Sequence, residues 1–287
     1  MYFNDFLREN RSQYDVLLSD IDGTLVHGKH PLPGAEELLR LCHELELPLF
    51  LLTNDSNHSL EEKSAIIRSA GLNIEASEII SAGSILKFFV KKHNCAGQKF
   101  FVLGDLGNSC FAELAGLQVC RDSSQIDECR GVIIGEGKYD WQEKLYAAFN
   151  FFIRHPERWL LSPNPDAYWP SHVLGEFGIG AGGKARFLSM LLGEHGIRLE
   201  PHYLGKPYPE IYHFALEEAR RCRDLKEPLK PSRALMLGDS LTSDIAGANA
   251  IGINSVLLMT GITTPDKLAN AAEDIRPSMV FAHLGKN

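Results

Sequence analysis

Four short polar clusters in the sequence contain residues that together could act on a phosphoryl group. They occupy residues 20–24 (Asp-Ile-Asp-Gly-Thr), 53–54 (Thr-Asn), 205–207 (Gly-Lys-Pro) and 238–244 (Gly-Asp-Ser-Leu-Thr-Ser-Asp). Taken singly, each cluster is more typical of a turn or loop, where Asp, Asn, Gly and Pro are common. Three of them, however, follow apolar runs that predict strands, and open α/β sheets bind ligands beyond the carboxyl ends of their strands. We therefore expect the four clusters to converge on one site.

Four aspartates in these clusters carry the charge of the expected site: Asp20, Asp22, Asp239 and Asp244. Gathered at one place, they would repel one another strongly unless a divalent cation neutralised them. An all-oxygen shell with few carboxylates suits Mg²⁺. We therefore expect a magnesium site, which would attract an anion despite the negative net charge of the protein.

A phosphate ester held at such a site would meet several reactive side chains. The ammonium of Lys206 and the metal would bridge the phosphoryl group. The carboxylate of Asp20 could attack phosphorus and form an aspartyl phosphate, while Asp22 protonates the leaving alcohol and later takes a proton from water. Gly23 would let the chain turn so that backbone N–H groups face the phosphate, and the Thr53 hydroxyl would add a donor.

Alternating strands and helices must position these residues. Apolar runs predict strands and segments with helical spacing of apolar residues predict helices. The predicted core strands are 14–20, 48–54, 233–239 and 254–259, and the predicted core helices are 34–45, 60–70, 211–220 and 242–251. This order predicts an α/β fold with a doubly wound, Rossmann-like parallel sheet.

The middle of the chain has elements of its own. Strands are predicted at 99–103, 131–134 and 159–161, and helices at 141–154 and 184–195. The stretch is long enough for a domain. We therefore expect a core domain, 1–82 plus 197–287, interrupted by an inserted α/β cap domain, 83–196.

Composition excludes several classes of protein. The 287 residues include 29 basic and 37 acidic side chains, which gives a net charge of −8 and argues against nucleic acid or an anionic membrane as a partner. The first ten residues lack the basic-then-apolar pattern of a secretory signal, and no apolar run is long enough to span a membrane. We expect a cytoplasmic protein.

The ordered motifs resemble those of the haloacid dehalogenase (HAD) superfamily: Asp-x-Asp-x-Thr, then Thr, Lys and Gly-Asp-x-x-x-x-Asp. More narrowly, they are similar to class IIA, the NagD-like and pyridoxal phosphate phosphatase-like branch. The residues behind that similarity are Pro33-Gly34-Ala35, Thr53-Asn54, Asn164-Pro165-Asp166, Gly180-Ala181-Gly182 and residues 205–209. The resemblance, which runs from Tyr14 to Gly261, implies a HAD core with a cap domain and a Mg²⁺-dependent hydrolase of small-molecule phosphomonoesters.

The resemblance also implies a role for each matching residue. Asp20 corresponds to the nucleophile and a metal ligand, and Asp22 to the general acid/base that gives the metal its backbone carbonyl. Asp239 corresponds to the second carboxylate ligand, and Asp244 to a residue that supports the metal shell. The phosphate-binding residues by position are Gly23, Thr53, Asn54 and Lys206.

Some points stay open at this stage. Asp55 stands where the family usually has Asn, which leaves the substrate contacts of this loop undecided. Asn164 and Asp166 belong either to a substrate-facing loop of the cap or to a surface turn. The alternative functions are a non-catalytic phospholigand-binding protein and a hydrolytic dehalogenase, and caps of this kind also suggest a homodimer.

Overall fold

The computed structural model describes residues 1–137, 139–170 and 176–286. The chain forms two compact units. The first consists of Met1–Thr53, Leu60–Ile80 and Lys206–Asn287, and the second of Asn54–Ser59 and Ser81–Gly205. The chain therefore passes between the units at four places, and two of these crossings lie beside Thr53 and Lys206.

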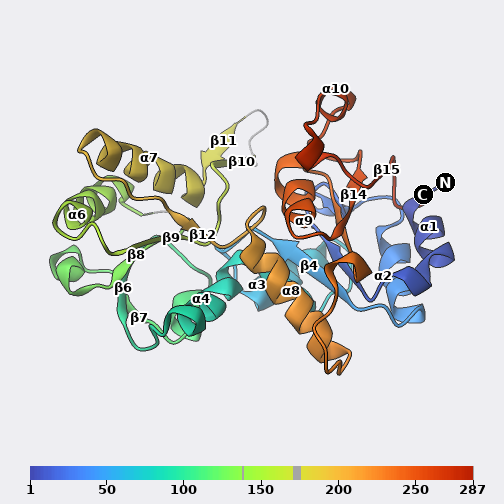
Figure 1. Cartoon of the computed structure of the whole chain (residues 1–287), viewed down its shortest axis with the longest axis horizontal. Coiled ribbons are helices and arrows are strands. Elements are labelled where there is room, and N and C mark those ends of the chain that lie inside the picture. The colour runs from blue at the N-terminus through green and yellow to red at the C-terminus, as the bar shows by residue number, and fades with distance from the viewer. Residues whose placement is uncertain (138, 171–175, 287) are drawn as a thin grey trace. The chain divides into compact units, whose positions relative to one another are not determined.

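The first unit is built on a six-stranded sheet (Figure 1). In spatial order its strands are β15 (Met279–Phe281), β14 (Asn254–Leu258), β13 (Ala234–Gly238), β1 (Val16–Ser19), β4 (Leu49–Thr53) and β5 (Ile79–Ser81). β1 pairs in parallel with both β13 and β4. All residues of β1, β4 and β13 are buried, which explains why these strands read as continuous apolar runs rather than alternating ones.

Helices pack against this sheet: α1 (Phe3–Glu9), α2 (Ala35–Glu44), α3 (Leu60–Ser69), α8 (Pro209–Cys222) and α9 (Ala246–Ala250). A further short helix, α10 (Pro265–Ala269), has no buried residue. In α2, Leu38, Leu41 and Cys42 are buried at helical spacing and join the core that the sheet forms. Gly34 precedes α2 with φ of +87°, and a Cβ there would lie 2.2 Å from the backbone nitrogen of Gly285, so only glycine fits.

The two ends of the chain meet on this unit. The N–H of Asn4 donates to the carbonyl of Leu284 at 2.9 Å, and the ring of Phe3 packs edge-on against Phe281 at 5.6 Å between centroids. Both termini lie at the same side of the unit in Figure 1. A short antiparallel ribbon of β2 (Val26–His27) and β3 (His30–Pro31) follows β1.

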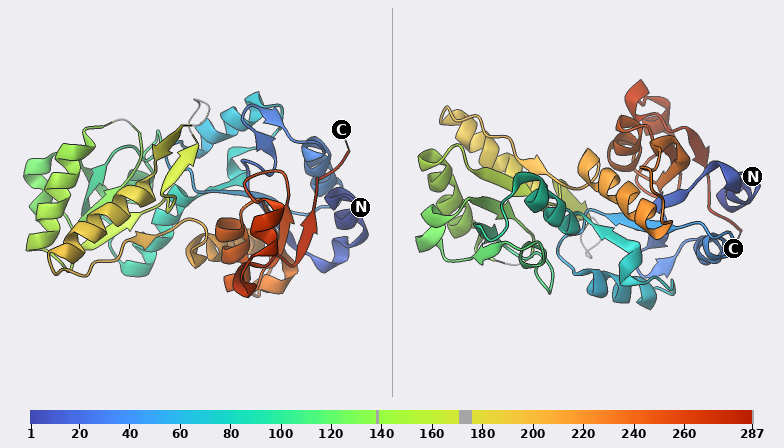
Figure 2. Two further views of the ribbon diagram at one scale, coloured as in Figure 1. Left: turned by 90° about the horizontal axis from the view of Figure 1, so that it is seen from above. Right: turned by 60° about the horizontal axis from the view of Figure 1, so that its bottom comes forward.

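The second unit is a smaller α/β layer. Its five-stranded sheet has the order β12 (His202–Tyr203), β9 (Trp159–Ser162), β8 (Gly131–Ile134), β6 (Lys99–Leu103) and β7 (Gln118–Cys120), with parallel pairing. Its helices are α4 (Leu86–His93), α5 (Phe111–Leu114), α6 (Trp141–Arg154) and α7 (Ala181–Glu194). α6 and α7 lie side by side (Figure 2). A two-stranded antiparallel ribbon, β10 (Tyr168–Pro170) and β11 (Phe177–Ile179), completes the unit.

The predicted α/β fold with a parallel-sheet core is confirmed. One helix differs in detail, because the segment predicted as a helix from 242 begins as a single π-helical turn, Leu241–Ile245, before α9. Such turns are common at functional sites, and this one carries Asp244. Among the described residues, no helix is long and apolar enough to cross a lipid bilayer.

Candidate active site

Strand register brings two aspartates to one edge of the first sheet. Ser19 of β1 lies opposite Leu237 of β13, and the N–H of Asp20 donates to the carbonyl of Leu237 at 2.8 Å. Asp20 and Asp239 therefore follow the carboxyl ends of adjacent parallel strands. This is the edge at which open α/β sheets bind ligands.

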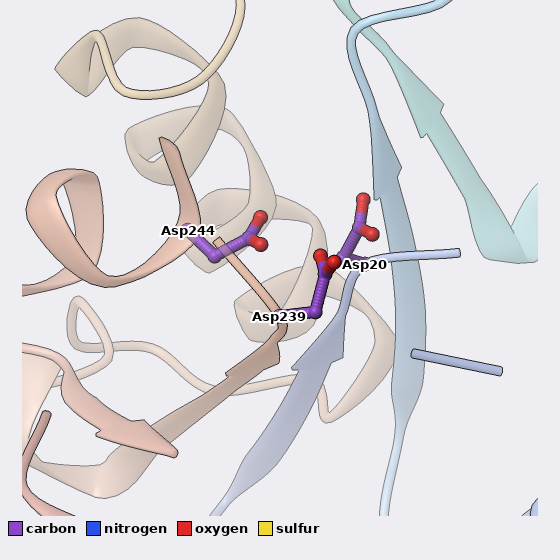
Figure 3. Close-up of side chains that lie close together, drawn as sticks. All are labelled: Asp20, Asp239 and Asp244. Atoms are coloured by element: carbon purple, nitrogen blue, oxygen red, sulfur yellow. The ribbon is translucent and has the colours of Figure 1, made fainter. Parts of the chain in front are cut away.

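Three carboxylates meet at this edge. Asp20, Asp239 and Asp244 each offer an oxygen, and the three oxygens lie within 4.8 Å of one another. Figure 3 shows their carboxyl groups pointing toward one another from the ends of β1 and β13 and from the π-helical turn. The exposed fraction is 4% for Asp239 and 1% for Asp244, so most of this charge is shielded from water.

A single lysine is bound into the same cluster. Lys206 Nζ donates to Asp20 Oδ1 at 2.5 Å and to Asp244 Oδ1 at 2.7 Å. Burial alone would lower the pKa of Lys206, but the two carboxylates outweigh it and raise that pKa. With the three carboxylates ionised, the cluster carries 3 − 1 = 2 net negative charges, which is the charge that one divalent cation neutralises.

The aspartate pKa values reflect the same excess of buried negative charge. Burial, and to a smaller extent the charge of Asp20, raise the pKa of Asp239 to about 6 against the opposing effect of the N–H of Ile262. Burial also raises the pKa of Asp244 to about 7, because the opposing effect of Lys206 is smaller and Asp20 and Asp239 add repulsion. Hard oxygen donors that are costly to ionise without a cation fit a Mg²⁺ site.

The loop after β14, which none of the four sequence motifs includes, holds Asp239 in place. The N–H of Ile262 donates to Asp239 Oδ2 at 2.7 Å, and Thr263 Oγ1 donates to the Asp239 carbonyl at 2.5 Å. A Cβ on Gly261 would lie 1.8 Å from Asp239 Oδ2. The sequence did hold one indication of this role: Thr260-Gly261 directly follows a predicted strand, at the edge of the sheet where the site was expected.

Asp244 is fixed by its own turn and by a buried tyrosine. Its Oδ2 accepts from the N–H of Ser240 at 3.1 Å, and a Cβ on Gly238 would lie 2.3 Å from its side chain. The hydroxyl of Tyr212, on α8, donates to the carbonyls of Ser243 and Asp244 at 3.1 and 3.2 Å. The helix that carries Tyr212 was predicted from its apolar spacing, whereas this contact depends on tertiary packing.

Two residues of the first motif, Asp22 and Gly23, place no carboxylate in the cluster of three aspartates. The side chain of Asp22 is 71% exposed, with Oδ2 3.6 Å from Lys63 Nζ, so this carboxylate is not one of the clustered ligands. Gly23 has φ of +82°, and its N–H donates to the carbonyl of Val26 at 2.8 Å. The turn therefore uses the N–H of Gly23 itself, and the expectation that backbone N–H groups near this turn face a phosphate stays a prediction. The glycine is needed for space, since a Cβ there would lie 2.5 Å from Asp239 Oδ2.

The second motif is divided between the two units. Thr53 ends β4 and is buried, whereas Asn54 belongs to the second unit. Asn54 Nδ2 donates to Asp166 Oδ1 at 3.0 Å, and the N–H of Asp166 donates to Asn164 Oδ1 at 2.8 Å. The two residues predicted as substrate contacts, Asn164 and Asp166, therefore lie in one hydrogen-bonded network with Asn54.

Asp55, which departs from the usual family residue, is paired within its own loop. Its Oδ1 accepts from the N–H groups of Asn57 and His58 at 2.9 and 3.3 Å, and its Oδ2 lies 2.8 Å from His58 Nδ1. These contacts offset part of the negative charge that this acid brings to the loop after Thr53.

Comparisons with known proteins identify the class of protein that this fold and site define. A model of haloacid dehalogenase-like hydrolases matches residues 17–118, and a HAD-hydrolase-like model matches residues 203–286. The chain belongs to this family of hydrolases.

Its relatives place it in the NagD-like branch, class IIA. It is 26% identical to the ribonucleotide monophosphatase NagD of Escherichia coli over 273 residues, covering 94% of this chain and 96% of that protein. It is 25% identical to the acid sugar phosphatase of Staphylococcus saprophyticus over 273 residues, covering 95% and 96% of the two chains. The structure of glycerol phosphate phosphatase from Mycobacterium tuberculosis in complex with magnesium matches with a TM-score of 0.79 at 24% identity, covering 95% of this chain and 75% of that chain.

Proposed function

We propose that the protein is a Mg²⁺-dependent phosphatase that hydrolyses small-molecule phosphomonoesters through an aspartyl phosphate on Asp20. The observation that carries this proposal is the cluster of three carboxylates, two of which, Asp20 and Asp244, bond to Lys206. Asp20, Asp239 and Asp244, with the backbone carbonyl of Asp22, would hold the metal or support its shell. When bound, Mg²⁺ supplies positive charge that offsets the charge developing on the phosphoryl oxygens.

The residues of the first unit would divide the reaction between them. The Asp20 carboxylate attacks phosphorus, and the ester oxygen leaves with a proton from Asp22, whose exposed side chain lies two residues further on. Lys206 and Thr53 bind the phosphoryl oxygens and place phosphorus in line with Asp20. Water then attacks the aspartyl phosphate, gives its proton to Asp22 and releases inorganic phosphate.

Asn54 contributes less directly. Because its side-chain amide donates to Asp166, we assign its contribution to phosphate binding to the backbone that follows Thr53.

The substrate class is proposed from the relatives. Their names refer to sugar phosphates, ribonucleoside monophosphates and glycerol phosphate. The alcohols of these compounds differ widely, whereas the phosphate monoester is common to all. We therefore propose a phosphomonoester of a sugar, a nucleoside or a similar small alcohol as the substrate.

Phosphate release from 4-nitrophenyl phosphate tests the proposed function. We expect release in Mg²⁺, none in EDTA, and none from Asp20→Asn in either buffer, with the fold of the variant checked by circular dichroism. A non-catalytic phospholigand-binding protein would release no phosphate in any of these conditions. A hydrolytic dehalogenase would instead release halide from a haloacid without needing the metal.

We also propose a cytoplasmic homodimer formed through the second unit. A groove of about 580 Å³ lies along α6 and α7, and three large side chains beside it, Trp141, Tyr146 and Phe187, are exposed by 48%, 73% and 43%. Exposed apolar surface of this kind is typical of an interface. Sedimentation of the wild type and of Tyr146→Glu would show a dimer for the first and a monomer for the second. We further propose that residues 1–82 and 197–287 form a core domain and that residues 83–196 form an inserted cap domain.

A further inference from the structure

The loop after β14 bonds to two separate segments of the proposed metal site, and both belong to the first unit. Thr260 Oγ1 donates to the carbonyl of Gly23 at 2.6 Å. Further along the loop, Thr263 Oγ1 donates to the carbonyl of Asp239 at 2.5 Å, and the N–H of Ile262 donates to Asp239 Oδ2 at 2.7 Å. The loop thus joins the turn after β1 to the end of β13.

Residues 260–263 of this loop, which we call the clasp, approach that turn closely at Asp239. A Cβ on Gly23 would lie 2.5 Å from Asp239 Oδ2 and 3.2 Å from the Cα of Gly261. A Cβ on Gly261 would lie closer still to the same carboxylate oxygen. The turn, the clasp and the Asp239 carboxylate therefore meet at one place, where a side chain on either glycine would displace the carboxylate.

The turn that the clasp holds also contains the proposed backbone donor to the metal, the carbonyl of Asp22. The N–H of Gly23 donates to the carbonyl of Val26 at 2.8 Å. Because a peptide group is planar, this hydrogen bond also restrains the Asp22 carbonyl, which belongs to the same peptide group. Thr260 restrains the next peptide group through the Gly23 carbonyl. Two consecutive peptide groups of the turn are therefore held in place.

The clasp contributes geometry rather than charge. Its four residues, Thr-Gly-Ile-Thr, have no ionisable side chain, so they do not neutralise the clustered carboxylates. Mg²⁺ requires nearly ideal octahedral geometry at short distances, whereas Ca²⁺ accepts more variable geometry. Hydrogen bonds that fix the relative positions of metal donors should therefore matter more for Mg²⁺ than for Ca²⁺.

We propose that Thr260 and Thr263 are positioning residues for the metal site. Their hydroxyls hold the turn with the Asp22 carbonyl and the carboxylate of Asp239 in the mutual arrangement that Mg²⁺ requires, and so raise the affinity for Mg²⁺ over that for Ca²⁺. This inference rests on the proposed function, because it takes the carboxylate cluster as a Mg²⁺ site. It goes further by giving a role to two hydroxyls that lie outside the four motifs and are not proposed as metal donors.

Calorimetric titration of the metal-free protein with Mg²⁺, and separately with Ca²⁺, tests the inference without relying on activity. Thr260→Val removes the hydroxyl and keeps a side chain of similar shape. It should raise the dissociation constant for Mg²⁺ by about tenfold or more, the usual effect of replacing a residue that orients a metal ligand. The dissociation constant for Ca²⁺ should rise by a smaller factor. Thr260→Ser keeps the hydroxyl and should bind Mg²⁺ as the wild type does.

A neighbouring threonine provides a matched control. The hydroxyl of Thr264 lies outside the clasp, where it accepts from the N–H of Lys267 at 3.3 Å and caps α10. Thr264→Val should lower the unfolding temperature and leave both dissociation constants unchanged, because it removes a helix cap and no bond to the metal site. Thr263→Val tests the second hydroxyl of the clasp in the same way as Thr260→Val, and it decides alone if Thr260→Val does not fold.

A folded Thr260→Val that binds Mg²⁺ as tightly as the wild type overturns the inference. So does an equal loss of affinity for Mg²⁺ and Ca²⁺, because the clasp would then not set the geometry of the site. Failure of the proposed function gives a different result, namely a wild type that binds Mg²⁺ but releases no phosphate from 4-nitrophenyl phosphate. A wild type that does not bind Mg²⁺ would contradict both.

Discussion

The metal-free protein should become more stable when one of its proposed metal ligands is neutralised. Asp239 has an ordinary pKa of 3.8 that is raised to about 6 in the fold. A raised pKa means that the folded state binds the proton more tightly than the unfolded state. The stability from this group is therefore present below pH 3.8 and is lost as the pH rises to about 6.

The size of the effect follows from the shift. About two pKa units, at about 1.4 kcal/mol per unit, give about 3 kcal/mol lost by the wild type above pH 6. Asp239→Asn removes the charge, and its amide oxygen can still accept from Ile262. In EDTA at pH 8 the variant should therefore be about 3 kcal/mol more stable than the wild type, and at pH 4 the difference should nearly vanish.

Urea unfolding at the two pH values measures this difference. Asp266→Asn, an exposed aspartate on α10, serves as the control and should follow the wild type at both pH values. Adding Mg²⁺ should stabilise the wild type at pH 8 but stabilise Asp239→Asn much less, because a ligand is missing. If Asp239→Asn is less stable than the wild type in EDTA at pH 8, the account of the buried charge is wrong.

Three further substitutions test the other parts of the site. Gly261→Ala places a methyl group against Asp239 and should lower both kcat and the unfolding temperature. Gly97→Ala is the control: φ is +75° there and no atom lies within 4 Å of the added methyl group, so kcat should not change. Lys206→Met should lower kcat/KM for 4-nitrophenyl phosphate by about a hundredfold or more, and unchanged kinetics would exclude Lys206 as a phosphate-binding residue. Asp22→Asn should lower kcat by about a hundredfold to ten-thousandfold with little change in thermal stability. The decrease in kcat should be smaller for 4-nitrophenyl phosphate than for an alkyl phosphate, because the alkoxide leaving group needs the proton more.

Much of the core could be predicted from the sequence because its strands are buried on both faces. Continuous apolar runs ending in polar residues located β1, β4 and β13 to within a few residues. Parallel pairing then brings the ends of β1 and β13 together, so Asp20 and Asp239 could be predicted to meet. The short strands β10 and β12 could not be found, because two or three residues carry no periodic signal.

The contacts of single side chains were harder to predict. The sequence indicated a turn at Gly23, but the partner of its N–H depends on where Val26 returns after the turn. The loop that holds Asp239 depends on β14 lying beside β13, which one chain segment does not reveal. Lys184 was predicted as part of a helix, but its burial beside Tyr139 follows from tertiary packing.

The central claim is that Asp20 carries the phosphoryl group during the reaction, and chemical trapping tests it most directly. The wild type would be mixed with 4-nitrophenyl phosphate and Mg²⁺, quenched in acid within one turnover, and reduced with borohydride, which converts an acyl phosphate to an alcohol. Mass spectrometry of the digested protein should then show homoserine in place of aspartate at position 20. If phosphate is released while residue 20 is unmodified, or while the modification lies on another residue, Asp20 is not the nucleophile.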